Sequence, residues 1–253
     1  MKQYNVFQAI ILSFYSKDLY RDVARHWNGK SFLYLLMIVA LSWIAAIYQF
    51  QVSLNESYRL NSDKIVKQIP VITINKGIIK TPENRPYLIY DSDNKLFAII
   101  DTTGQYRSLN QAKASVLITK TEIISQTKPN KTRIDRLPSI MNMVISAEAI
   151  NNVILKLIGY TWIMAYLFML LFSFLYRIIQ AFLYSIIGMF FSSFCTVPLF
   201  YSQIVQLSMV AVTPAIVVAT LFDYFGIVFL YQYLFYFFVA MFYLFYAILA
   251  NKN

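Results

Sequence analysis

The sequence contains one cysteine, Cys195, and one histidine, His26. A single cysteine cannot form a disulfide framework, and one histidine with one cysteine is too few for a transition-metal site built from these residue types. Cys195 stands in an apolar run, where we expect a small buried hydrophobic residue. The sequence therefore predicts neither a metal ion nor a cofactor.

Charged residues are also scarce, at 13% of the chain, against 58% hydrophobic residues and a mean hydropathy of +0.54. Residues 153–250 contain only three charges: Lys156, Arg177 and Asp223. No soluble domain can expose such a surface to water, whereas a membrane-spanning helix needs about 20 mainly apolar residues. The composition predicts an α-helical polytopic membrane protein whose apolar helices contact the lipid bilayer.

The net charge of +10 does not indicate nucleic-acid binding. Fourteen of the 22 Lys and Arg residues lie within residues 51–152, where Asp and Glu are interspersed among them. A nucleic-acid binder concentrates basic residues on one face, among aromatic residues that stack on bases. We therefore expect no nucleic-acid partner.

The N-terminal third begins with an amphipathic segment, residues 1–30, whose apolar residues recur at helical spacing. It either lies on the inner membrane surface or packs as an ordinary helix against the membrane domain. Residues 31–50 carry no charge and are long enough for the first crossing. Five Lys and Arg residues precede this crossing, so the positive-inside rule puts the N-terminus in the cytoplasm.

Residues 51–152 then form an extracytoplasmic α+β domain, which at about 100 residues can bury a modest core. We expect helices over 55–68 and 138–152. Apolar runs separated by turn-forming residues predict a small, mainly antiparallel sheet. The predicted strands are 71–74, 77–79, 87–90, 97–100, 115–119 and 123–125.

Residues 153–250 form a bundle of four further crossings, which makes five in all. The predicted helices are 153–176, 181–200, 204–222 and 226–249. The second and third of these should be antiparallel neighbours, because their connection is short. Arg177 and Asp223 would lie at inner helix ends, and an odd number of crossings would place the tail, 251–253, outside.

Two acidic motifs invite a catalytic or metal-binding interpretation. Asp101-Thr102-Thr103-Gly104 resembles the Asp-Thr-Gly loop of aspartic proteases, but no second copy supplies the paired carboxylate. Asp91, Asp93 and Asn94 could offer oxygens to calcium, yet the spacing lacks the glycine and distant glutamate of a full loop. We expect a strand ending in a polar turn and a solvated hairpin turn, and therefore no catalytic residue.

The candidate functional residues lie in the bundle. Asp223 is the only acid of the bundle, and a carboxylate within a membrane segment is a functional candidate by default. A residue at a helix boundary nevertheless fits Asp223 better than a proton relay does. Pro214 leaves a carbonyl without its usual donor and bends the predicted fourth crossing. Four glutamines either join helices by hydrogen bonds or line a substrate path: Gln180, Gln203, Gln206 and Gln232.

Several runs, in their order and spacing, resemble DUF1189, a bacterial membrane-protein family of unknown function. They are residues 13–24 (SFYSKDLYRDVA) ahead of 32–35 (FLYL), 70–74 (PVITI) followed by Gly77, 100–104 (IDTTG), 116–120 (VLITK) and 207–214 (LSMVAVTP). The resemblance implies a bacterial inner membrane with the sheet domain outside, and a bundle similar to Yip-type five-helix proteins. A maltodextrin-utilisation label on some family members hints at sugar uptake.

Two functions from different classes follow. The first is a non-enzymatic scaffold or accessory factor whose outer domain contacts another membrane or envelope protein. The alternative is a transporter or transporter subunit, for sugar uptake for example, that uses the third to fifth helices. An intramembrane hydrolase lacks the paired catalytic groups it would need.

Overall fold

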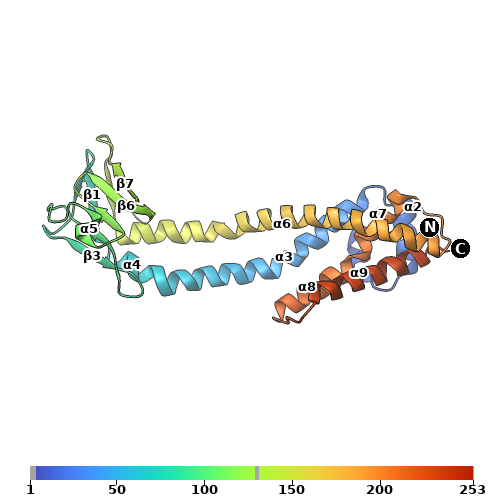
Figure 1. Cartoon of the computed structure of the whole chain (residues 1–253). Coiled ribbons are helices and arrows are strands. Elements are labelled where there is room, and N and C mark those ends of the chain that lie inside the picture. The colour runs from blue at the N-terminus through green and yellow to red at the C-terminus, as the bar shows by residue number, and fades with distance from the viewer. Residues whose placement is uncertain (1–3, 129–130, 253) are drawn as a thin grey trace. The chain divides into compact units, whose positions relative to one another are not determined.

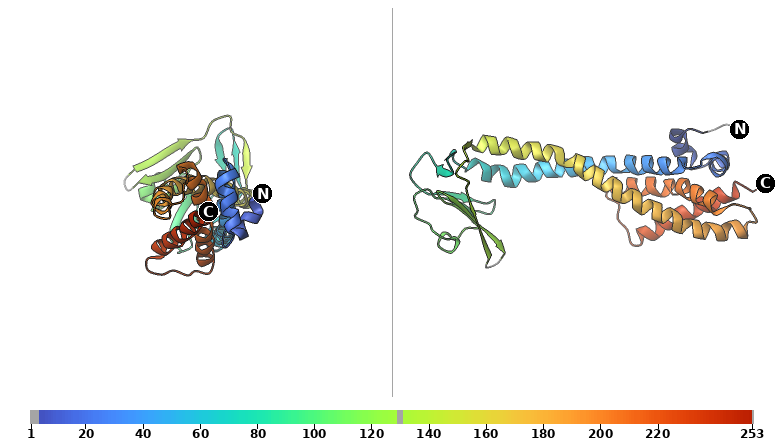
Figure 2. Two further views of the ribbon diagram at one scale, coloured as in Figure 1. Left: turned by 90° about the vertical axis from the view of Figure 1, so that its right-hand side faces the viewer. Right: turned by 90° about the horizontal axis from the view of Figure 1, so that it is seen from above.

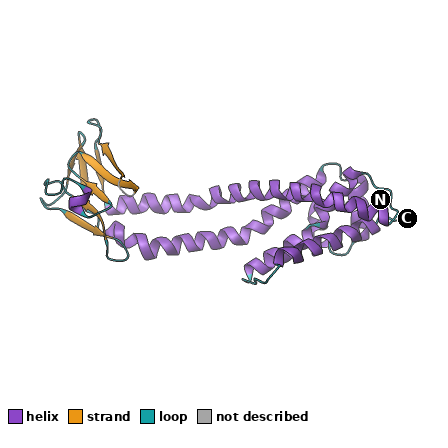
Figure 3. Cartoon of the chain, viewed as in Figure 1, coloured by secondary structure: helices purple, strands orange, loops and turns teal. Residues whose placement is uncertain are grey.

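The structure is a computed structural model that describes residues 4–128 and 131–252. These residues divide into two compact units. We call the first the helical unit; it runs up to Gln49 and resumes at Ile163. The second, the sheet unit, is Phe50–Trp162 and holds all the strands of the described chain (Figure 3).

The N-terminal segment forms two helices instead of one, α1 (Val6–Leu12) and α2 (Lys17–His26) (Figure 1). Serines separate them: the Ser13 hydroxyl donates to a carbonyl in the last turn of α1, and Ser16 caps α2. The Ser16 hydroxyl accepts the backbone N–H of Leu19 at 3.2 Å, which satisfies one of the free donors at the start of α2.

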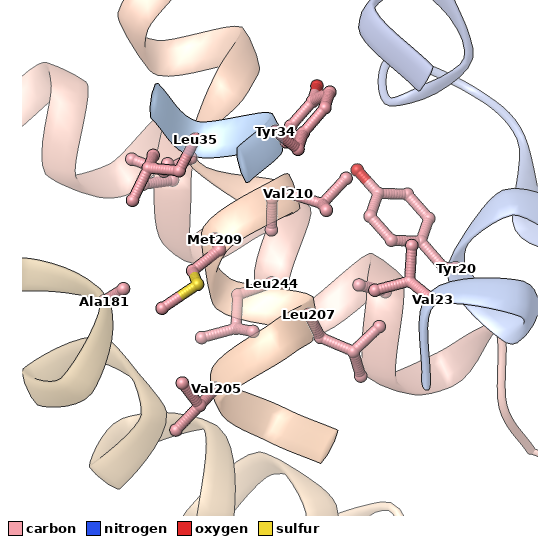
Figure 4. Packing of buried hydrophobic residues seen from close by; sticks show 14 of the residues in the cluster. Tyr20, Val23, Tyr34, Leu35, Ala181, Val205, Leu207, Met209, Val210 and Leu244 are labelled. Atoms are coloured by element: carbon pink, nitrogen blue, oxygen red, sulfur yellow. The ribbon is translucent and has the colours of Figure 1, made fainter. Parts of the chain in front are cut away.

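The apolar face of α2 is buried inside the helical unit. Tyr20 and Val23 are fully buried and share one core with Leu207 and Leu244, which come from α7 (Tyr201–Ala211) and α9 (Gln232–Leu249) (Figure 4). Of the two interpretations of the N-terminal segment, the structure shows the helix packed against the bundle.

The first predicted crossing, 31–50, lies in α3 (Lys30–Ser57). A π-helical turn, Tyr58–Ser62, and α4 (Asp63–Lys67) prolong the helix. The helix expected over 55–68 is therefore a continuation of α3 and not a separate element.

The next two predicted crossings, 153–176 and 181–200, are one continuous helix, α6 (Ala147–Phe194), and the prediction of two was wrong. Arg177 marked the predicted break, but a charge between good helix formers does not end a helix. The chain turns after Phe194, where Thr196 has a left-handed φ of 55° and Pro198 follows.

The fourth predicted crossing, 204–222, spans α7 and α8 (Thr213–Tyr224). Pro214 is the second residue of α8, where its missing N–H leaves no hydrogen bond unmade, so it starts a helix instead of bending one in the middle. The fifth, predicted from 226, begins at Gln232 in α9, after a connection in which Gly226 and Tyr231 have φ values of 66° and 64°.

In the described residues, four helical runs, not five, are long and apolar enough to span a membrane: Lys30–Lys67, Ala147–Phe194, Tyr201–Tyr224 and Gln232–Leu249. An even number of crossings would return the chain to its starting side, and both views of Figure 2 show the end of α9 close to the N-terminal helices. Arg21 Nε donates to the Ala250 carbonyl at 2.7 Å, and Asn251 Nδ2 to the Tyr20 carbonyl at 3.4 Å. The prediction that the tail, 251–253, lies across a membrane from the N-terminal segment was wrong for Asn251 and Lys252; Asn253 is outside the described residues.

The C-terminal part of α6 packs antiparallel to α7, as expected for these two segments. The Ser185 hydroxyl donates to the Ser208 hydroxyl at 3.0 Å, and one turn further along α6 Gly188 faces Ile204. A Cβ at Gly188 would lie 2.5 Å from Ile204 Cγ2, so this crossing is as close as it is because position 188 has no side chain. Cys195 is buried at 6% exposure, as predicted.

The sheet unit contains two sheets. One has the order β2-β1-β8 and the other β3-β4-β5-β6-β7. The bounds are β1 Ile72–Asn75, β2 Ile78–Lys80, β3 Tyr87–Tyr90, β4 Leu96–Ile100, β5 Val116–Ile118, β6 Glu122–Lys128, β7 Lys131–Arg136 and β8 Met143–Ile145. Among the described strands only the β4–β5 pair is parallel, which confirms a mainly antiparallel α+β arrangement. Its crossover connection contains α5 (Leu109–Ala112).

Alternation along β4 separates two small cores. Ala98 and Ile100 pack with Ile74 of β1, so one core lies between the two sheets. Ile99 points the other way and packs with Leu117 and with α5. Successive side chains of a strand face opposite sides, and here both sides are covered.

Two expectations for this unit were incomplete or wrong. The helix expected over 138–152 is instead β8 followed by the start of α6 at Ala147, because Val144 pairs with Thr73 of β1. The strand β7 was not predicted, since every one of its residues is exposed and none of the usual apolar alternation marks it.

Candidate functional site

The Asp101 carboxylate organises its own turn. It accepts the Thr103 N–H at 2.8 Å, the Thr103 hydroxyl at 2.6 Å and the Tyr106 N–H at 2.7 Å. Burial alone would raise the pKa of this carboxyl, but these hydrogen bonds outweigh burial and hold the pKa below its ordinary value. Strand β4 ends at Ile100 and Asp101 begins this turn, so the expected strand ending in a polar turn is confirmed.

In the acidic turn after β3, the Asp91 carboxylate likewise accepts its hydrogen bonds from the backbone of its own turn. Asp91 Oδ1 accepts the N–H of Asp93 at 2.9 Å and of Lys95 at 2.8 Å, and Asn94 has a φ of 58°. This is the expected hairpin turn. Across residues 4–128 and 131–252, no three His, Cys, Asp or Glu side chains gather closely enough to hold a metal ion.

The helical unit has a different feature. Within residues 31–49 and 163–251 the sequence contains only two charges, Arg177 on α6 and Asp223 near the end of α8. Both line one pocket of about 290 Å³. The other lining residues come from α3, α6 and α8: Val39, Ser42, Trp43, Ala45, Ala46, Gln49, Ser173, Tyr176, Ile216, Ala219, Thr220 and Tyr224.

The walls of this pocket combine one bridge with several small residues. Trp43 Nε1 donates to Ser173 Oγ at 2.9 Å, which joins α3 to α6. Ala46 of α3 and Ala219 of α8 have too little side chain to fill the space between their helices. The pocket therefore exists because small residues lie beside a fixed contact between α3 and α6.

Most polar groups in the walls already have partners. The hydroxyls of Ser42 and Thr220 donate to carbonyls of their own helices at 2.8 and 2.9 Å. Arg177 Nη1 donates to Gln180 Oε1 at 2.6 Å, its one hydrogen bond to another described residue. A guanidinium has five N–H donors, and the Asp223 carboxylate has no hydrogen bond or ion pair within the described chain, so the pocket retains one cationic and one anionic group for a ligand.

The structure corrects the expected place of these two charges. Gln203 Nε2 donates to the Ala24 carbonyl at 3.0 Å, so α7 begins beside α2. The run of α7 and α8 then ends near Asp223, at the end remote from α2. Asp223 and Arg177 therefore do not lie at the end of the helices that holds the N-terminal segment. The count of five crossings had reversed their position.

The other candidates do not line this pocket. Gln203 Oε1 accepts the Phe200 N–H at 2.8 Å, so with its bond to Ala24 it acts as a packing device between α7 and α2. The Oε1 atoms of Gln206 and Gln232 are buried without a partner in the described chain. Pro214 starts α8.

Sequence reasoning noted Arg177 but did not pair it with Asp223. The available signal was that they are the only base and the only acid within residues 157–250. Charges within membrane segments usually face a partner or a cavity. Gln49, Ser42 and Trp43 were not predicted as site residues, because only their position on α3 brings them to the pocket.

The match to known proteins covers both units. The sequence profile of a family described as protein of unknown function, DUF1189, matches residues 7–248. The chain belongs to the DUF1189 family. No curated protein and no solved structure matches this DUF1189 chain. Family membership names no ligand or activity, so the function has to be argued from the residues.

Proposed function

We propose that this chain is an integral protein of the bacterial cytoplasmic membrane that acts as a non-enzymatic scaffold or accessory factor in an envelope or uptake process. The observation that carries this proposal is the apolar outer surface of the helical unit. Phe168 and Phe190 of α6 are 59% and 72% exposed, and Phe238 of α9 is 60% exposed. The most hydrophobic part of α6 has no buried residue at all.

Water is a poor solvent for that surface. Soluble monomers rarely expose contiguous apolar patches larger than a few hundred Å². Burying apolar area stabilises by about 25 cal/mol per Å², so acyl chains are the favourable surroundings for these side chains. The helices also satisfy their own backbone groups, as a lipid environment requires.

The sheet unit has the opposite character. Fourteen of the 22 Lys and Arg residues belong to residues 51–152, and its two cores are buried between its own elements. In the proposal this unit lies in water outside the membrane and contacts a membrane or envelope protein, while α2 and the chain ends lie in the cytoplasm. The acidic turns at Asp91 and Asp101 are used by the local backbone, which supports a role without catalysis.

Cysteine labelling tests the membrane proposal directly, because Cys195 is the only cysteine and is buried. In a Cys195→Ala background, Asp18→Cys and Asp93→Cys would each carry a single accessible thiol. A membrane-impermeant maleimide should label position 93 in intact spheroplasts and position 18 only after permeabilisation. Labelling of both on the same side, or recovery of the protein in the soluble fraction, would contradict the proposal.

The partner requires a separate experiment. Affinity capture of the full chain, repeated in several detergents, should recover the same membrane or envelope protein each time. Recovery of nothing but the chain itself would argue against a scaffold.

A transporter subunit is the second candidate, and the pocket with Arg177 and Asp223 favours it. Asp223→Asn should then abolish uptake of the transported solute while membrane insertion stays normal. Lys156→Gln, which removes an exposed charge outside the pocket, is the matched control. Normal uptake in the Asp223→Asn variant would exclude a transport role for this carboxylate.

A further inference from the structure

We propose that the pocket between α3, α6 and α8 binds a zwitterion that carries a phosphate and a primary ammonium group, as the headgroup of phosphatidylethanolamine does. The proposal rests on the membrane location proposed above. It adds a ligand class to a site for which the family description gives none.

Charge is the first argument. Arg177 and Asp223 are the only charges in residues 31–49 and 163–251, they are of opposite sign, and they line the same pocket. They do not form an ion pair with each other or with another described residue. Charges surrounded by apolar helices need a counter-charge, and a ligand with both signs would supply two at once.

The Arg177 side chain suits the phosphate. Gln180 Oε1 accepts from Arg177 Nη1 at 2.6 Å, and Gln180 Nε2 in turn donates to the Tyr184 hydroxyl at 2.6 Å. This chain of hydrogen bonds orients the guanidinium and uses one of its donors. The planar guanidinium can bind two phosphate oxygens with its remaining N–H groups.

The Asp223 carboxylate suits a primary ammonium. A carboxylate only accepts hydrogen bonds, and a primary ammonium offers three N–H donors. A quaternary ammonium offers none, so Asp223 should distinguish phosphatidylethanolamine from phosphatidylcholine. An anionic headgroup without an amine would leave Asp223 unpaired.

Size and surroundings narrow the ligand further. The volume of about 290 Å³ lies just below the range of about 300–1,000 Å³ for small-molecule sites, which suits a headgroup better than an oligosaccharide. Trp43, Tyr176 and Tyr224 line the pocket, and such amphipathic rings favour the headgroup level of a bilayer. Next to Tyr176 on α6, Leu175 is 48% exposed and offers apolar surface to acyl chains.

The test is retention of lipid by the full chain. Protein reconstituted in vesicles with equal amounts of phosphatidylethanolamine, phosphatidylcholine and phosphatidylglycerol would be extracted, and the retained lipid counted by native mass spectrometry. We expect phosphatidylethanolamine to be retained several-fold over both others. Arg177→Gln should reduce retention of every phospholipid at least ten-fold. Asp223→Asn should keep phospholipid but lose the preference for the primary amine.

Lys156→Gln and Asp93→Asn are the matched controls, because each removes a charge that lies outside the pocket, and both should retain lipid as the unaltered chain does. A second measurement needs no variant: retention should fall stepwise as the amine is methylated once, twice and three times. Soluble glycerophosphoethanolamine identifies the source of the ligand. If it binds saturably and displaces the lipid, the same chemistry is supplied by a soluble zwitterion.

Equal retention of the three lipids, or unchanged retention in both pocket variants, would overturn the proposal. So would retention that does not respond to methylation of the amine. If the chain inserts with the expected cysteine labelling but shows no headgroup preference, only the ligand proposal is refuted. A chain that does not insert would refute the membrane proposal itself.

Discussion

At the scale of single residues, buried carboxylates fix the local backbone. Asp101 is stabilised in its ionised form, because every hydrogen bond to its oxygens comes from an N–H or O–H donor. Its pKa in the folded chain is below the ordinary value of about 3.9, so the unfolded chain binds its proton at higher pH. This stabilisation is fully present above pH of about 4 and is lost as the pH falls through the lower pKa of the folded state.

Replacing Asp101 should therefore change both stability and its pH dependence. In Asp101→Asn the amide group places an N–H where the native carboxylate accepts one, which should cost about 1–3 kcal/mol. Hydrogen exchange of the β4 and β5 amides, measured by mass spectrometry from pH 7 down to pH 3, should be faster than in the native chain at neutral pH. The difference should shrink as the native carboxylate becomes protonated.

Asp93→Asn is the control, since Asp93 is exposed in a turn and its replacement should change the free energy of unfolding by no more than about 0.5 kcal/mol. Equal exchange in both variants, or a difference that grows at low pH, would show that the Asp101 carboxylate does not organise this turn.

Asp22 shows where sequence reasoning stops at this scale. It is 4% exposed, and its carboxylate accepts from Trp27 Nε1 at 3.0 Å and lies 2.9 Å from His26 Nδ1. The sequence did not single it out, because an aspartate on an amphipathic helix ordinarily faces water. Its burial follows from the tertiary packing of α2 and is not visible in local spacing.

At the scale of elements, the crossing of α6 and α7 depends on Gly188. A methyl group there would approach Ile204 Cγ2 to 2.5 Å, and Ile204 is 1% exposed and has little room to move. We expect Gly188→Ala to destabilise by about 1–3 kcal/mol through overpacking, less the gain in helix propensity of about 1 kcal/mol. The thermal midpoint in detergent should fall by about 2–4 °C for each kcal/mol lost.

Gly159→Ala provides a matched control on the same helix. A Cβ at Gly159 meets nothing within 4 Å, so only the gain in helix propensity remains and the midpoint should stay equal or rise slightly. A Gly188→Ala variant as stable as Gly159→Ala would mean that α6 and α7 are not in close contact in the folded protein.

Most elements could be predicted from local patterns, and the exceptions have physical reasons. The alternation of Ile72 and Ile74 with the exposed Thr73 marks β1, and Lys76-Gly77 marks the turn that follows, where both residues have positive φ. By contrast, β8 depends on a partner strand some seventy residues earlier in the chain, and the unbroken α6 shows that Arg177 is compatible with a helix interior. Local sequence carries neither fact.

At the scale of the whole molecule, the number of helical runs determines which residues meet. With five crossings, Arg177 and Asp223 would lie at the inner ends of separate helices. With four runs, they line the same pocket at the end of α8. The sequence singles out Asp223 by its charge, whereas its position and its place in the same pocket as Arg177 depend on a helix count that one misplaced break had altered.

The same count decides where the chain ends. Arg21 Nε donates to the Ala250 carbonyl, and the Tyr246 hydroxyl donates to the Tyr15 carbonyl at 2.7 Å, so the end of α9 is held beside α2. Lys252 should therefore share its side of the membrane with Asp18. In the Cys195→Ala background, Lys252→Cys should be labelled by an impermeant maleimide only after permeabilisation, as Asp18→Cys is. Labelling together with Asp93→Cys in intact spheroplasts would mean that the chain crosses an odd number of times, and the closure of α9 on α2 would then be wrong.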